Sequence, residues 1–321
     1  MSQAETRLPN FFIVGAPKAG TTSLYHHLDQ HPEVFMSPMK ETSYFSREMR
    51  LERFAPELQA LGKRSAESLR AYLDAPPLGR RFGGIVSEWD DYRRLFSGVR
   101  QERAIGEASP GYLWSKTAAA RIADFAPAAK ILIILRNPID RAYSQYLQMA
   151  NTGDYRRSFR EHLKACLAHP ETEEISVLHP FLEYGLYADQ VKRYIDVFPA
   201  SQVGLWLYED SRAPGFLRTV FELLEVDGGF RPDISKRHLE QRIPRVPYLN
   251  RLLRGLGVAE GIRRVVPASV RPWLRKAIYR PRNRVKMTPA ERSMLAAYYR
   301  QDVSRLESLL QRDLSSWLRC E

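Results

Sequence analysis

Residues 11–24, which read FFIVGAPKAGTTSL, constrain the fold of this 321-residue chain more than any other stretch. The stretch opens with four apolar residues, enough for a buried strand, continues through a loop bounded by Gly15 and Gly20, and takes on helical spacing from Thr21. A strand that leads through a glycine loop into a helix N-terminus offers an anion orphan N–H groups and the positive end of a helix dipole. The sequence therefore predicts an anion site here, with Lys18 as a mobile cation at the tip of the loop.

This loop differs from the phosphate loop of nucleoside triphosphatases. That motif, G-x-x-x-x-G-K-[ST], places lysine directly after the second glycine, whereas this chain has Thr21 there and its lysine at position 18. Two further hydroxyl residues, Thr22 and Ser23, follow, and each can bond an anion's oxygen atoms. An ordinary strand-turn-helix with a surface lysine is the alternative, but it leaves three consecutive hydroxyls unexplained.

Strands and helices alternate along the rest of the chain. The run from Lys130 to Leu135 is apolar without alternation, which is typical of a parallel strand buried on both faces, and Pro138 then stands at the first position of a helix. Further strands are expected within 31–35, 104–110 and 203–208, and further helices at 66–73, 90–96, 115–125, 155–168, 183–197, 215–224 and 288–310. We place residues 39–45 on a loop near the first strand. This order predicts a P-loop-like parallel α/β sheet flanked by helices, with the glycine loop at its carboxyl edge.

The positive charge is concentrated in one late segment. The chain has a formal net charge of +12, yet residues 231–286 alone hold 16 Lys and Arg against 3 Asp and Glu, a net of +13. We expect this segment to be a basic helical insertion before the last helix, serving as a lid, as a substrate-binding segment or as a face toward an anionic membrane. A solvated face is the plainer alternative. The whole chain, 1–321, is expected to form a single domain.

Targeting and redox features point to one compartment. No apolar run approaches the roughly 20 residues that cross a bilayer, and the first residues lack the apolar core of a signal peptide. The two cysteines, Cys166 and Cys320, disfavour a disulfide framework or a zinc site. We predict a cytoplasmic protein without a metal, with membrane association through residues 231–286 as the alternative.

A second candidate anion site follows the strand at 130–135. Arg136 stands where that strand ends, and Ser144 lies on the helix that Pro138 opens. A guanidinium can hold a phosphate bidentately, and the serine hydroxyl can support it. A structural salt bridge of Arg136 is the alternative. Two anion sites on neighbouring strands suit a ligand with phosphate groups at both ends of a nucleoside.

These motifs resemble those of the sulfotransferase family that uses 3′-phosphoadenosine 5′-phosphosulfate. Residues 17–24 are similar to the family's 5′-phosphosulfate loop, and residues 136–144, RNPIDRAYS, to its 3′-phosphate element. Weaker likeness is found at Lys40-Glu41 and at residues 106–112, 184–187 and 312–317. The resemblance is to bacterial members and to the heparan sulfate sulfotransferase branch.

The resemblance implies transfer of a sulfuryl group to a hydroxyl, or alternatively an amine, of a carbohydrate, glycolipid or secondary metabolite, with release of 3′,5′-diphosphoadenosine. The residues implied to hold the 5′-phosphosulfate are Lys18, Ala19, Gly20, Thr21, Thr22 and Ser23. Arg136 and Ser144 are implied to hold the 3′-phosphate, and Pro244-Arg245 would bring a further arginine toward it. Glu41 is implied to be the general base that deprotonates the acceptor, with Glu107 as a weaker alternative.

Physical chemistry agrees with these roles. Sulfuryl transfer resembles phosphoryl transfer, in which charge builds up on the leaving oxygen of a loose in-line transition state. Lys18 at the loop tip can meet that charge, and losing such a contact typically costs ~10²–10³ in rate. A carboxylate can take the proton of the attacking hydroxyl.

Two other functions remain as alternatives to sulfotransfer. The first is a nucleotide kinase or hydrolase, which the displaced lysine disfavours. The second is a non-enzymatic anion-binding protein built around residues 231–286, which would show a steep salt dependence with DNA. We expect an acceptor small molecule or glycan as the partner, with an anionic or a lipid-linked acceptor among the alternatives, and no nucleic acid.

Overall fold

The computed structural model describes residues 7–152, 157–169, 172–235, 243–244, 279–280 and 287–320. The strands are β1 (Phe11–Gly15), β2 (Val34–Met36), β3 (Met39–Lys40), β4 (Arg81–Phe82), β5 (Ala104–Ala108), β6 (Lys130–Leu135), β7 (Val203–Leu207), β8 (Ile243–Pro244) and β9 (Tyr279–Arg280). The α-helices are α1 (Thr21–Leu28), α2 (Pro56–Leu73), α3 (Trp89–Arg94), α4 (Ala118–Phe125), α5 (Pro138–Thr152), α6 (Phe159–Leu167), α7 (Tyr187–Val197), α8 (Phe216–Leu223) and α12 (Pro289–Leu310). Short 3-10 helices include η2 (Pro110–Tyr112), η3 (Glu183–Gly185) and η7 (Ser315–Leu318).

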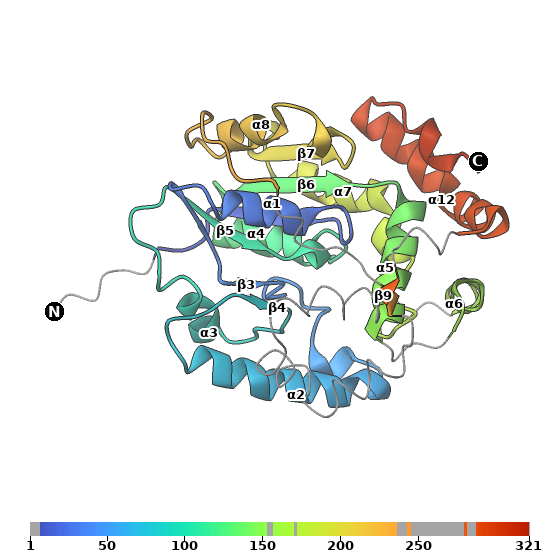
Figure 1. The fold of residues 1–321 in the computed structure, drawn as a ribbon, viewed down its shortest axis with the longest axis horizontal. Coiled ribbons are helices and arrows are strands. Elements are labelled where there is room, and N and C mark those ends of the chain that lie inside the picture. Colours follow the sequence, from blue (N-terminus) through green and yellow to red (C-terminus); the bar gives the residue numbers. More distant parts are fainter. Residues whose placement is uncertain are drawn as a thin grey trace.

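A five-stranded parallel sheet forms the centre of the molecule, in the order β2-β5-β1-β6-β7, with helices on both faces (Figure 1). The predicted parallel α/β sheet flanked by helices is therefore confirmed. After β1 the chain turns toward β5 and β2, whereas after β6 it turns toward β7. The adjacent ends of β1 and β6 thus form a topological switch point, the place where open α/β sheets bind ligands.

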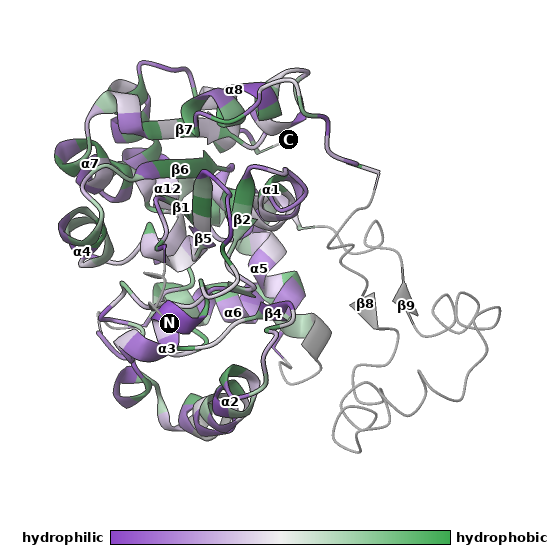
Figure 2. Cartoon of the chain, turned by 90° about the vertical axis from the view of Figure 1, so that its left-hand side faces the viewer, coloured by the Kyte–Doolittle hydropathy of each residue, from purple (hydrophilic) through white to green (hydrophobic). Residues whose placement is uncertain are grey.

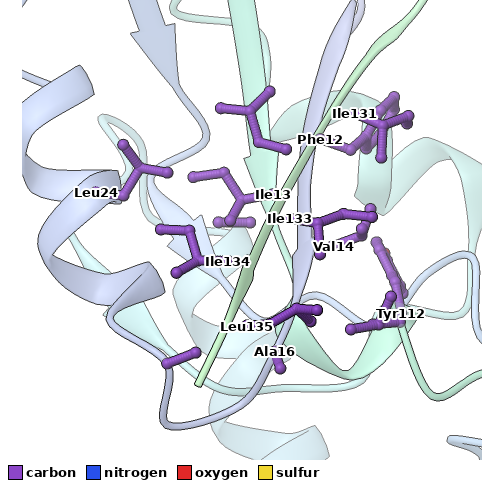
Figure 3. Close-up of a cluster of buried hydrophobic side chains, with 14 of the residues drawn as sticks. Phe12, Ile13, Val14, Ala16, Leu24, Tyr112, Ile131, Ile133, Ile134 and Leu135 are labelled. Atoms are coloured by element: carbon purple, nitrogen blue, oxygen red, sulfur yellow. The ribbon is translucent and has the colours of Figure 1, made fainter. Parts of the chain in front are cut away.

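The core lies where the sequence placed its longest apolar runs. β1 is buried at every position, and β6 at every position after Lys130. Figure 3 shows Ile13 and Val14 of β1 among Ile133, Ile134 and Leu135 of β6. Because both faces of β1 and β6 are covered, neither strand shows the alternation of apolar and polar residues that is typical of a half-exposed strand. In Figure 2 the hydrophobic colour gathers in the central strands.

A small second ribbon lies beneath the sheet, between α1 and α2 (Figure 1). In it β3 pairs in parallel with β4, with Met39 opposite Arg81 and Lys40 opposite Phe82. The prediction of a loop for residues 39–45 is therefore wrong at its first two residues. Strands of two residues have no measurable period, so the sequence could not reveal them.

The remaining predicted helices and strands are present with shifted ends, and the correction at α2 is the largest. The predicted helix at 66–73 begins ten residues earlier, at Pro56, the proline position that favours helix initiation. The final helix has the predicted capping box: the Thr288 hydroxyl accepts from the Glu291 N–H while the Glu291 carboxylate accepts from the Thr288 N–H.

The basic segment 231–286 is described only at residues 231–235, 243–244 and 279–280, where β8 and β9 pair antiparallel. The predicted helical insertion, including Arg245, otherwise lies outside the described residues. Within the described part of the chain, no helix combines the length and apolar character needed to span a bilayer.

Candidate functional site

The loop after β1 lies at the switch point of the sheet. Gly20 precedes α1 with a φ of 97°, and Lys18 has a φ of 67°, both in the left-handed region. A Cβ on Gly20 would lie 3.2 Å from the Tyr208 ring, so space as well as backbone conformation favours glycine. The first N–H groups of a helix lie before its regular backbone hydrogen bonds begin, and in α1 the Ser23 N–H donates to the Gly20 carbonyl at 3.0 Å.

Side-chain contacts join this loop to the β6–α5 junction. The Lys18 ammonium donates to Oε1 of Gln148 on α5 at 2.7 Å. The Arg136 guanidinium donates to the Lys18 carbonyl at 3.1 Å. The two motifs predicted to bind anions, more than a hundred residues apart in sequence, therefore meet at one place in the fold.

Arg136 is held in this position from several directions. Its guanidinium lies 4.9 Å from the centroid of the Tyr208 ring, directly after β7, and its carbonyl accepts from the Tyr187 hydroxyl at 2.9 Å. Arg212 stacks on the same Tyr208 ring, 4.7 Å from its centroid. Two guanidinium groups thus flank one aromatic ring beside the glycine loop.

Ser144 lies further along α5 and is buried. Arg141, which shares its helix face, is fully buried and donates to the Phe181 carbonyl and to Gln145, both at 2.6 Å. Arg141 therefore fastens α5 to the segment before η3 and belongs to the core. Arg136 and Ser144 remain the anion-facing candidates of this element.

Glu41 follows β3 with a φ of 67°, and its N–H donates to the Ala108 carbonyl at 2.7 Å. Its carboxylate accepts from the Lys40 ammonium at 2.7 Å, and the side chains are 51% and 1% exposed respectively. Desolvation by the surrounding protein favours the neutral form of this half-exposed carboxyl, but the Lys40 charge and hydrogen bond, with a further contribution from Lys18, hold the pKa of Glu41 below its usual value. Backbone strain at a half-exposed carboxylate is typical of a functional position.

Glu107, the alternative base, has a different environment. It is fully buried, and its carboxylate accepts hydrogen bonds from four hydroxyls, those of Thr42, Ser109, Tyr92 and Tyr112. Burial raises its pKa despite these donors. The four bonds tie the segment after Glu41 to the end of β5, which makes Glu107 a structural acid beneath the site.

Three residues of the site were not identified from the sequence. Gln148 follows Ser144 by four positions on α5, so helical spacing could have revealed it. Tyr208 comes directly after β7, at the carboxyl edge of the sheet, so its position at the end of a predicted strand could also have revealed it. That Lys40 is buried while it pairs with Glu41 could be learned only from the structure.

In the described part of the chain, no group of three or more His, Cys, Asp or Glu side chains is placed to hold a metal ion.

Comparison with known proteins identifies the family. The model of the sulfotransferase family matches residues 9–193, more than half of the chain. This chain belongs to the sulfotransferase family. The matched range contains the candidate residues from Lys18 to Gln148, whereas Tyr208 and Arg245 lie beyond it.

Individual relatives agree with the family assignment. The crystal structure of a sulfotransferase from Alicyclobacillus acidocaldarius is 34% identical in sequence and superposes with a TM-score of 0.69, covering 98% of this chain and 100% of that chain. Carbohydrate sulfotransferase 15 of Rattus norvegicus is 28% identical over 256 residues, 68% of this chain and 44% of the relative. Bifunctional heparan sulfate N-deacetylase/N-sulfotransferase 4 of Mus musculus is 28% identical over 331 residues, 98% of this chain and 31% of the relative. The chain therefore spans less than half the length of these two curated relatives.

Proposed function

We propose that this sulfotransferase moves a sulfuryl group from 3′-phosphoadenosine 5′-phosphosulfate to a carbohydrate hydroxyl and releases 3′,5′-diphosphoadenosine. The observation that carries the proposal is the hydrogen bond between the Arg136 guanidinium and the Lys18 carbonyl, because it joins two anion-binding elements at the switch point. A nucleotide with a phosphate group at each end of adenosine fits two such elements.

The residues assigned to each end follow from this arrangement. The 5′-phosphosulfate is held by Lys18, Ala19, Gly20, Thr21, Thr22 and Ser23, and the 3′-phosphate by Arg136 and Ser144. Lys18 can leave its present partner at small cost, since Gln148 offers it a neutral amide oxygen whereas the donor offers a charged one.

The reaction requires no covalent intermediate on the protein. The acceptor oxygen attacks sulfur and forms the new S–O bond, while the bond from sulfur to the bridging 5′-phosphate oxygen breaks. Glu41 takes the acceptor's proton, and negative charge collects on the leaving phosphate, where Lys18 and the α1 N-terminus stabilise it. Because the pKa of Glu41 is lowered, the carboxylate is ionised at neutral pH. A carboxylate so much less basic than an alkoxide takes the proton only as the new bond forms.

The acceptor class is supported by the relatives, whose names specify carbohydrate and heparan sulfate. Glycolipids and secondary metabolites, and transfer to an amine, are the other outcomes to be tested. A basic segment with a net charge of +13 suits an anionic glycan. Membrane contact through this segment and a cytoplasmic location stay predictions.

A radiolabelled-donor assay tests the proposal. The purified chain is incubated with 3′-phosphoadenosine 5′-[³⁵S]phosphosulfate and separate panels of glycans, glycolipids and simple phenols, and the labelled products are separated. We expect label in a glycan and stoichiometric formation of 3′,5′-diphosphoadenosine. Label in phenols alone would replace the acceptor assignment, and no transfer to any panel would refute the proposed activity.

A further inference from the structure

We propose that the exposed ring of Phe82 is an acceptor subsite, which stacks on the apolar face of a pyranose ring and thereby presents one of its hydroxyls to Glu41. The inference rests on the function proposed above and specifies where the acceptor sugar lies. It concerns β4, a strand without an assigned role.

The register of the small ribbon places Phe82 beside the candidate base. Phe82 lies opposite Lys40 in the β3–β4 pair, and neighbouring strands are about 4.8 Å apart. The Lys40 side chain is buried and reaches the Glu41 carboxylate. Phe82 and Glu41 thus flank the same buried lysine, one from the neighbouring strand and one from the next residue in the chain.

Phe82 is unusually exposed for its size. Its exposed fraction is 53%, the largest among the described aromatic residues. The ring still has neighbours that fix its place, since its centroid lies 5.9 Å from that of His26 and 6.4 Å from that of Tyr25. One part of the ring is therefore held against α1 while the rest is open to a ligand.

The same contacts connect Phe82 with the proposed donor site. His26 follows Thr22 by four residues on α1, so the two share a helix face. Helical spacing and the ring contact between His26 and Phe82 thus connect the start of α1 with β4, which pairs with the strand before Glu41. Figure 1 shows β3 and β4 on the side of the sheet that faces α2, below α1 in the view.

The surroundings of Phe82 favour an uncharged ring face as its ligand. The two arginines before it are engaged: Arg80 pairs with Asp29 and donates to the Tyr25 hydroxyl, and Arg81 stacks on Tyr72 and donates to Ser68. A pyranose has a face of C–H bonds and a rim of hydroxyls. Its C–H face can cover the Phe82 ring while a hydroxyl on its rim points to the carboxylate. A flat phenol would instead favour a slot with two apolar walls.

Saturation-transfer NMR and kinetics test this subsite, using methyl β-D-glucopyranoside and cellobiose as ring probes and sorbitol as an acyclic polyol. The NMR experiment is run on the complex with 3′,5′-diphosphoadenosine and needs no turnover. We expect transfer to the pyranose C–H protons in the wild type, its loss in Phe82→Ala and its recovery in Phe82→Trp. Ile195→Ala, which removes a similarly exposed apolar side chain from α7, should behave as the wild type.

In the kinetic experiment Phe82→Ala should lower kcat/KM for the glycan acceptor about tenfold, mainly through KM. The affinity for 3′,5′-diphosphoadenosine should not change, which also shows that the variant is folded. Equal losses for ring probes and sorbitol, unchanged values in Phe82→Ala, or no saturation transfer in the wild type would overturn the subsite. Absence of sulfuryl transfer together with ring binding that depends on Phe82 would instead refute the proposed function alone.

Discussion

Lys40 and Glu41 are neighbours in the sequence, yet their side chains are 1% and 51% exposed. The buried ammonium holds one side of the carboxylate and leaves the other side open. This arrangement keeps the carboxylate ionised and fixed in direction, at the cost of some basicity. In the proposed mechanism, the strength of the base is therefore set by Lys40, a residue that the acceptor does not need to touch.

The Lys40–Glu41 pair predicts a specific pH dependence. Transfer needs the ionised carboxylate, so kcat/KM should fall as the pH falls through the pKa of Glu41, which lies below its usual 4.5. Lys40→Met removes the charge that lowers this pKa, so the acid limb should move to higher pH. Glu41→Gln should lose roughly 10²–10⁴ in kcat and keep its nucleotide affinity. An acid limb that stays in place in Lys40→Met would separate Lys40 from the base.

Lys18 supports a second prediction at the same scale. Lys18→Ala should lower kcat by about 10²–10³, because the charge on the leaving phosphate loses the cation proposed to stabilise it. Lys63→Ala, which changes an exposed lysine on α2, is the matched control and should keep full activity. Single-turnover rates with the radiolabelled donor give the comparison. Equal rates in the two variants would remove Lys18 from the mechanism.

Among the helices, α7 depends on a distant residue for its N-terminal cap. The Asp302 carboxylate on α12 accepts from the N–H of Tyr187 at 2.6 Å and of Ala188 at 3.2 Å. The helix has no side-chain cap of its own. Because the Tyr187 hydroxyl also bonds the Arg136 carbonyl, α12 supports the candidate 3′-phosphate residue through the start of α7.

Asp302 should make stability depend on pH in an unusual direction. Burial raises its pKa from 3.8 to about 6 despite the two N–H donors. The folded state therefore binds more protons than the unfolded state between about pH 4 and 6, and this residue's contribution declines as the pH rises through that window. The free energy of unfolding of Asp302→Asn, relative to that of the wild type, should rise by up to roughly 3 kcal/mol as the pH rises through this window. Urea unfolding at several pH values measures this difference. The surface variant Asp90→Asn is the control, and a difference from the wild type that is constant with pH would contradict the argument.

At the scale of helices and strands, the sequence predicted those elements that are marked by patterns of several residues. The apolar runs of β1 and β6 and the capping box of α12 each involve several residues with a defined spacing, and each was found. The β3–β4 ribbon and the Asp302 cap were not, because two-residue strands have no period and a cap more than a hundred residues away leaves no local signal. The ribbon positions Glu41 and Phe82, so the proposed acceptor side of the site was harder to foresee than the proposed donor side.

Across the whole molecule, the candidate site draws on the loop after β1, the end of β3, the β6–α5 junction and the end of β7. Contacts between these segments, such as that of Arg136 with Lys18 and Tyr208, link parts of the chain that are distant in sequence. A ligand that bridges them binds the folded state and has no comparable site in the unfolded chain. Donor binding should therefore stabilise the entire fold.

This linkage gives a test of the two-phosphate site that needs no acceptor. At a hundred times its Kd, 3′,5′-diphosphoadenosine should add about 2.7 kcal/mol to the free energy of unfolding, which raises Tm by several degrees. ATP with magnesium should give a smaller shift, because it lacks the 3′-phosphate. Arg136→Ala should lose most of the shift, whereas Arg100→Ala, an exposed arginine before β5, should keep it. A larger shift with ATP would support a kinase-like ligand, and a full shift in Arg136→Ala would place the 3′-phosphate elsewhere. A Tm shift that is larger with 3′,5′-diphosphoadenosine than with ATP, and that is lost in Arg136→Ala, would show that the protein holds both phosphate ends of the nucleotide at once.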